Sequence, residues 1–119
     1  MIDKKEYILC AAIKRLEPKT CTPYYNNDIC NIEIGYRHHD IFQRFQGEVS
    51  RKQEDQGFYT SKGRFVGRYE GMLIAYKANQ VTAKIAFGGN FNAIEDIIDN
   101  SSDDLLIKYC YALYSEDLY

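Results

Sequence analysis

The spacing of apolar and polar positions predicts two strands near the start of the chain. Residues 7–13 are a short continuous apolar run, typical of a strand that crosses the middle of a sheet, so we expect a strand from Glu6 to Arg15. Residues 29–36 alternate between apolar and polar, as a half-buried strand does, with one side formed by Cys30, Ile32, Ile34 and Tyr36. The polar stretches 17–27 and 46–56 are expected to be surface connections.

The rest of the pattern predicts helices and one more strand. Residues 38–45 fit a short helix, although a second hairpin strand is an alternative. Residues 63–80 are the clearest predicted helix, because their apolar positions recur at helical spacing. Residues 81–87 alternate as a strand does, Asn90 can cap a further helix, and Ser101 or Ser102 can begin the last one. This order predicts an α+β fold, a mainly antiparallel sheet packed with helices in a single small domain over residues 1–119.

Composition and charge narrow the classes of function. A length of 119 residues with 45% hydrophobic and 27% charged residues is that of one ordinary globular domain. The net charge of -2 argues against a general DNA or RNA binder, which needs an excess of Lys and Arg. No apolar run approaches the roughly 20 residues that cross a bilayer, and the start of the chain lacks a secretory signal's apolar core. We therefore expect a cytoplasmic protein without a membrane partner.

The cysteines and histidines do not suggest a metal site. The four cysteines lack metal-binding spacing and are expected to be free thiols: Cys10, Cys21, Cys30 and Cys110. Both histidines lie in the sequence Arg37-His38-His39-Asp40, but adjacent side chains point in different directions on a strand or a helix and so cannot share one ion. An arginine beside an imidazole is better suited to a phosphate and a nucleotide base. The alternative is a solvated strand end.

A second candidate anion site lies at the start of the predicted long helix. On that helix Arg64 and Arg68 would lie four residues apart on one face, where two like charges favour an anion between them. The alternative is that they pair with loop carboxylates such as Glu54 or Asp55. Gly63, Gly67 and Gly71 would form a row of bare backbone along the same helix, open to close approach by a neighbour.

Motifs for catalysis are lacking. The turn Gly88-Gly89-Asn90 has neither a dinucleotide-binding nor a P-loop pattern, so it is expected to be a tight turn before a helix. The sequence contains no G-x-S-x-G elbow, and its cysteines lie mostly in apolar runs rather than in electropositive turns. We expect a protein that is not an enzyme and that needs no cofactor.

Four segments together resemble a known family of small phage proteins. They are residues 6–13, residues 34–42 (Ile-Gly-Tyr-Arg-His-His-Asp-Ile-Phe), residues 56–68 (Gln-Gly-Phe-Tyr-Thr-Ser-Lys-Gly-Arg-Phe-Val-Gly-Arg) and residues 115–119 (Ser-Glu-Asp-Leu-Tyr). In order and spacing they resemble the Thoeris anti-defence protein 1 family. Those proteins sequester the cyclic ADP-ribose signal made by bacterial TIR-domain immune enzymes, and some also sequester cyclic oligonucleotides of the CBASS system.

The resemblance implies a protein that works in the infected host cell. It would bind and sequester a nucleotide of the glycocyclic ADP-ribose type without cleaving it. It also implies a homo-oligomer, a dimer or an assembly of dimers, with pockets shared between protomers. At the matching positions, the resemblance implies that the pyrophosphate and ribose would be contacted by Arg37, His38, Arg64 and Arg68. It also implies that the ligand would stack on Phe58 and Phe65. The rival hypotheses are a phage inhibitor that binds a host defence protein and a small phosphodiesterase that uses His38 or His39.

Overall fold

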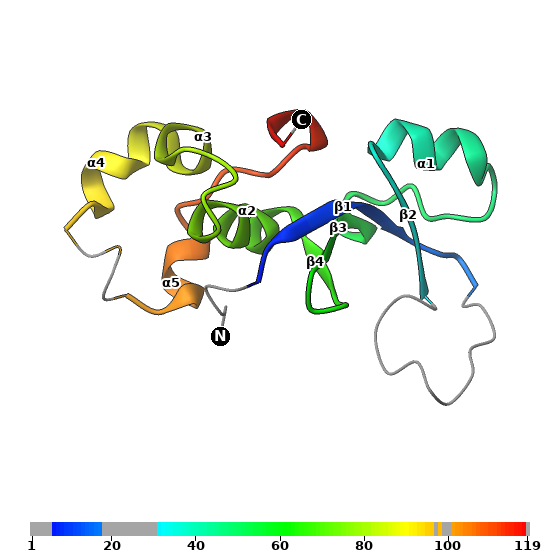
Figure 1. The fold of residues 1–119 in the computed structure, drawn as a ribbon, viewed down its shortest axis with the longest axis horizontal. Coiled ribbons are helices and arrows are strands. Elements are labelled where there is room, and N and C mark those ends of the chain that lie inside the picture. Colours follow the sequence, from blue (N-terminus) through cyan, green and yellow to red (C-terminus); the bar gives the residue numbers. More distant parts are fainter. Residues whose placement is uncertain (1–5, 18–30, 97, 99–100, 119) are drawn as a thin grey trace.

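An antiparallel sheet of four strands forms the centre of the fold (Figure 1). The computed structural model describes residues 6–17, 31–96, 98 and 101–118. The strand order is β2-β1-β3-β4, and the strands are β1 (Ile8–Lys14), β2 (Ile32–Gly35), β3 (Gln56–Thr60) and β4 (Phe65–Gly67). Every neighbouring pair is antiparallel. The predicted α+β class and the central apolar strand are confirmed.

Helices pack around this sheet and beyond one end of it (Figure 1). They are α1 (His38–Arg44), α2 (Arg68–Lys77), α3 (Ala83–Phe87), α4 (Phe91–Ile94) and α5 (Asp103–Ile107). Short 3₁₀ turns cover Gln53–Asp55, Gly88–Asn90 and Ser115–Asp117. Three predicted helices are confirmed, namely α1, α4 and α5, and at the start of α5 the Ser102 side chain accepts the Leu105 N–H. The predicted Asn90 cap of α4 is wrong, because the Asn90 side chain makes no cap bond and instead donates to the Tyr109 carbonyl.

The predicted helix over residues 63–80 is wrong in its first part. Gly63 has a φ of 76° and closes a tight turn, in which its N–H donates to the Thr60 carbonyl. The chain then runs back along β3 as β4, and α2 begins only at Arg68. Gly63, Gly67 and Gly71 therefore lie in a turn, at a strand end and in a helix, so they do not form a row on one helix.

Three other sequence expectations are corrected. Residues 81–87 contain α3 rather than a strand, because Thr82 caps a helix by accepting the Ile85 N–H. The supposed surface connection 46–56 includes Val49, which forms a buried bridge opposite Arg15, and the start of β3. In β2 the Glu33 side chain is buried and pairs with Arg15 at 2.8 Å, whereas Ile34 is partly exposed. Cys21, Cys30 and most of the predicted loop 17–27 lie outside the described residues.

The core lies between one face of the sheet and α2. Buried side chains of the three strands β1, β3 and β4 meet those of α2, in a cluster that includes Ile13, Phe58, Val66, Leu73 and Leu113. Of the three glycines expected to allow close approach by a neighbour, Gly71 is the one at which α2 lies close to β3. An added Cβ there would lie 3.2 Å from the Phe58 ring. Residues after α5 also join this cluster. The C-terminal segment, residues 111–118, therefore returns to the start of α2 (Figure 1).

Gly57→Ala is expected to destabilise the protein by about 3 kcal/mol, because it forces two strands apart. An added Cβ would lie 2.0 Å from the Val66 carbonyl oxygen of β4. The matched control is Gly67→Ala at the paired position of β4, where an added Cβ would meet no described heavy atom within 4 Å apart from those of its chain neighbours. It should cost less than about 1 kcal/mol. Urea denaturation measures both, and equal losses would contradict the close contact.

Candidate functional site

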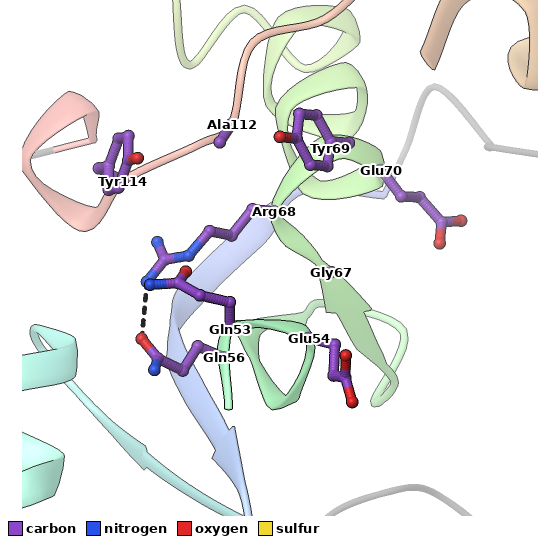
Figure 2. Close-up of a pocket in the computed structure, with 9 residues that line it drawn as sticks. All are labelled: Gln53, Glu54, Gln56, Gly67, Arg68, Tyr69, Glu70, Ala112 and Tyr114. Atoms are coloured by element: carbon purple, nitrogen blue, oxygen red, sulfur yellow. Dashed lines mark hydrogen bonds between the residues drawn. The ribbon is translucent and has the colours of Figure 1, made fainter. Parts of the chain in front are cut away.

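A cleft of about 640 Å³ opens where the start of α2, the start of β3 and the C-terminal segment meet (Figure 2). Polar, charged and aromatic side chains dominate its lining, which consists of Gln53, Glu54, Gln56, Gly67, Arg68, Tyr69, Glu70, Ala112 and Tyr114. Figure 2 shows both carboxylates at the end of the cleft away from the Arg68 guanidinium. The cleft therefore has one cationic end and one acidic end.

Arg68 forms the cationic end and is held on several sides. Its Nη1 donates to the Leu113 carbonyl at 2.9 Å, and its Nη2 donates to Gln56 Oε1 at 3.0 Å. The guanidinium carbon lies 4.9 Å from the centre of the Tyr114 ring, a cation–π distance. Burial lowers the pKa of Arg68, but a guanidinium stays charged at neutral pH. Its Nε is buried and has no hydrogen-bond partner among the described residues, so one donor is left unused.

Arg37 and His38 lie beside this cationic end. Arg37 Nη1 is 3.4 Å from Glu116 Oε1, yet that buried nitrogen makes no hydrogen bond within the described part of the chain. His38 is buried, and its Nε2 donates to the Gly57 carbonyl at 2.7 Å. Burial and the Arg68 charge lower the pKa of His38 to about 4. His38 is therefore a neutral structural donor at physiological pH.

Arg64 lies elsewhere and has its own counter-ions. It donates to the buried Glu6 carboxylate through Nε at 2.7 Å and Nη2 at 2.9 Å, and to Glu70 through Nη1 at 3.1 Å. Thr60 Oγ1 also donates to Glu6, at 2.6 Å. Arg64 lowers the pKa of Glu6, and Glu6 raises that of Arg64. Since Arg64 precedes β4, it shares no helix face with Arg68. The alternative prediction was a loop carboxylate such as Glu54 or Asp55 as its partner, but the carboxylates that pair with Arg64 are Glu6 and Glu70.

The two phenylalanines proposed as stacking surfaces lie outside the cleft lining. Phe58 is 0% exposed in the core, where its ring meets the edge of His38 at 5.1 Å. Phe65 is half-buried on β4, and Lys14 Nζ lies 5.1 Å from its ring centre. The aromatic rings of the cleft are instead Tyr69 and Tyr114, both more than half exposed. The signal for Tyr114 in the sequence was its place directly before residues 115–119, one of the four segments that carry the resemblance.

Neither a metal cluster nor a membrane-spanning helix is found among the residues that the structure describes. Among those that the structure describes, no three His, Cys, Asp or Glu side chains gather in a way that could hold a metal ion. Cys10 and Cys110 are free thiols, and burial raises the pKa of both. Within the described ranges every helix is too short or too polar to cross a bilayer.

A comparison with family models finds a match over nearly the whole chain. The model described as Phage T4 y16D protein matches residues 7–119, nearly the whole chain. That description names a phage protein and states no activity. No curated protein and no solved structure matches the chain.

Arg64→Ala is expected to lower the free energy of unfolding by about 2–4 kcal/mol, because Glu6 would stay buried without its counter-ion. Urea denaturation measures the loss. Arg44→Ala is the matched control, since Arg44 is exposed and donates only to the Ile34 carbonyl among the bonds described. It should cost less than about 1 kcal/mol. If Arg64→Ala left the free energy of unfolding unchanged, Glu6 would not depend on this ion pair.

Lowering the pH from neutral toward 4 is expected to destabilise the fold by up to roughly 3 kcal/mol through His38. The ring takes up a proton near pH 6.5 in the unfolded chain but only near pH 4 in the folded one. Its stabilisation is therefore complete above pH 6.5 and is lost as the pH falls to 4. Glu6, whose pKa is lowered by Arg64, adds its own loss only below its ordinary value of 4.5.

Urea denaturation across this pH range measures the effect. His38→Gln is the control, because its amide can donate to the Gly57 carbonyl but does not titrate. Between pH 6.5 and 4.5 this variant should lose most of the slope. The same slope in both proteins would show that another group is responsible.

Proposed function

Since the chain belongs to the phage T4 y16D protein family, we propose that it is a phage anti-defence protein that sequesters a cyclic ADP-ribose-type signalling nucleotide without cleaving it. The proposal combines the phage family with the resemblance of four segments to the Thoeris anti-defence protein 1 family. The single observation that carries it is Arg68, a charged guanidinium with an unused buried N–H, in one cleft with two exposed tyrosine rings.

The cleft has the size and chemistry for such a ligand. Its volume of about 640 Å³ lies within the range of roughly 300–1,000 Å³ found for small-molecule sites. Arginine pairs well with phosphate oxygens, and tyrosine rings provide flat surfaces for a nucleobase. The amides of Gln53 and Gln56 lie beside Arg68 in Figure 2 and can bond to ribose hydroxyls or base edges. The ligand's phosphates would lie at the Arg68 end, away from Glu54 and Glu70.

Binding without turnover is supported by the residue types in the cleft. The residues that line it include no histidine and no cysteine, and His38 nearby is buried with its Nε2 already bonded. Glu70, one of its two carboxylates, is paired with Arg64. A nucleophile beside a general base, as covalent catalysis requires, is not found among these residues.

The proposal includes a homo-oligomer. Tyrosine is enriched in protein interfaces, and four of the tyrosines that the structure describes are at least half exposed: Tyr36, Tyr69, Tyr111 and Tyr114. Two of them line the cleft, so a second protomer that covered them would also enclose the ligand. Such an arrangement would remove the cation and the rings from water and strengthen binding.

Glycocyclic ADP-ribose mixed with the protein is expected to disappear from the free pool and to return intact after the protein is denatured by heat. Chromatography before and after heating measures both steps, with a cyclic oligonucleotide as a second ligand and light scattering for the oligomer. Recovery of cleaved ligand would favour a phosphodiesterase. If neither nucleotide is depleted, the proposal fails, and an inhibitor of a host defence protein becomes the better hypothesis.

Arg68→Ala is expected to weaken this binding by about 1.5–3 kcal/mol, the range for a hydrogen bond to a charged group. Calorimetric titration measures the affinity. Arg44→Ala is the matched control, since it removes the same charge on α1 outside the cleft and should leave affinity nearly unchanged. Equal affinity of Arg68→Ala and wild type would place the nucleotide elsewhere.

A further inference from the structure

We propose that Arg37 and Arg68 together form the oxyanion subsite for the ligand's pyrophosphate, and that the Glu116 carboxylate occupies this subsite in the free chain. The inference rests on the proposed function, because it names how one part of the same nucleotide would be bound. It adds Arg37 and Glu116, neither of which lines the cleft, and it makes the C-terminal segment an internal competitor of the ligand.

The C-terminal segment is held against the start of α2 by a reciprocal pair of hydrogen bonds. The Leu113 N–H donates to the Arg68 carbonyl at 3.0 Å, and Arg68 Nη1 donates to the Leu113 carbonyl at 2.9 Å. The following turn is closed by the Tyr114 N–H, which donates to Asp117 Oδ2 at 3.0 Å. These bonds fix the turn that carries Glu116, whose carboxylate lies 3.4 Å from Arg37 Nη1.

Glu116 acts as a counter-ion for more than its direct partner. Its Oε1 lies 3.4 Å from Arg37 Nη1, and its charge partly offsets the lowering of the pKa that burial causes in Arg68 and in His38. Yet its side chain is 68% exposed and makes no hydrogen bond to the nitrogen that it faces. An exposed ion pair of this kind is weak, so a better anion can replace it.

The two arginines keep donors that a carboxylate at this position does not use. Within the described residues, Arg37 Nη1 and Arg68 Nε are the buried side-chain nitrogens without a hydrogen-bond partner. Buried polar groups in native proteins are nearly always paired, so both donors are available to an acceptor that a ligand supplies. A pyrophosphate has more acceptor oxygens than one carboxylate and forms charge-assisted bonds with guanidinium groups.

The test compares Glu116→Gln with a matched variant that removes a charge from the same region. Glu54→Gln lowers the negative charge of the cleft equally but touches neither arginine in any described contact. Calorimetric titrations with glycocyclic ADP-ribose and with inorganic pyrophosphate measure the affinity of each protein. Glu116→Gln should bind the nucleotide up to about fivefold more tightly than wild type, which is the strength of an exposed ion pair. Glu54→Gln should change affinity less than about twofold.

A second pair of variants tests whether Glu116 acts through Arg37. Arg37→Gln should weaken binding by tenfold or more, the loss expected for a charge-assisted hydrogen bond. In the Arg37→Gln background, Glu116→Gln should no longer improve affinity beyond the gain given by Glu54→Gln. This double-mutant comparison separates a direct competitor from a general change in the electrostatic field.

The outcomes distinguish this inference from the function on which it rests. If the nucleotide binds but Glu116→Gln and Glu54→Gln give equal gains, Glu116 does not occupy the subsite, and sequestration stands. If pyrophosphate binds with the expected pattern but the nucleotide does not, the subsite stands, and the proposed function fails. If neither probe binds any variant, both are overturned.

Discussion

The reciprocal hydrogen bonds between Arg68 and Leu113 are the interaction on which the candidate site depends. They join the first residue of α2 to a segment 45 positions later and so bring Ala112 and Tyr114 to the cleft. Leu113 itself is buried in the core, which anchors this segment by apolar packing as well as by hydrogen bonds. Without that anchor Arg68 would lose a carbonyl partner and the Tyr114 ring at once.

Arg64 and Arg68 have different roles because they have different partners. Arg64 faces Glu6, which is 1% exposed, and its charge-assisted bonds stabilise the turn between β3 and β4. Arg68 faces a carbonyl, an amide and a ring, none of which neutralises its charge. A cation held mainly by neutral groups still attracts a mobile anion. The charge of a cation paired with a buried carboxylate is already balanced by that carboxylate. This difference, rather than spacing in the sequence, assigns Arg64 to the fold and Arg68 to the cleft.

The sequence predicts the parts of this fold that depend on local signals. The apolar run of β1 and the Ser102 cap of α5 are such signals, and both are found in the structure. The hairpin β3-β4 was hidden because Phe65, Tyr69, Met72 and Leu73 recur at helical spacing although Gly63 turns the chain before β4. Residues 81–87 mislead in the opposite way, since an alternating pattern there forms α3 once Thr82 caps it. Periodicity identifies apolar positions in both cases, but a single turn or cap decides which element forms.

The candidate site was only partly predictable, because its members come from distant parts of the chain. Arg37 and Arg68 could be singled out as cations at element ends, and the structure places both at helix starts. The Tyr114 ring and the Glu116 carboxylate become relevant only when the C-terminal segment packs against α2, which no local pattern encodes. A ligand bound there would contact the start of α2, the start of β3 and that segment together. Its binding free energy would thus add to the free energy that holds these three parts in place.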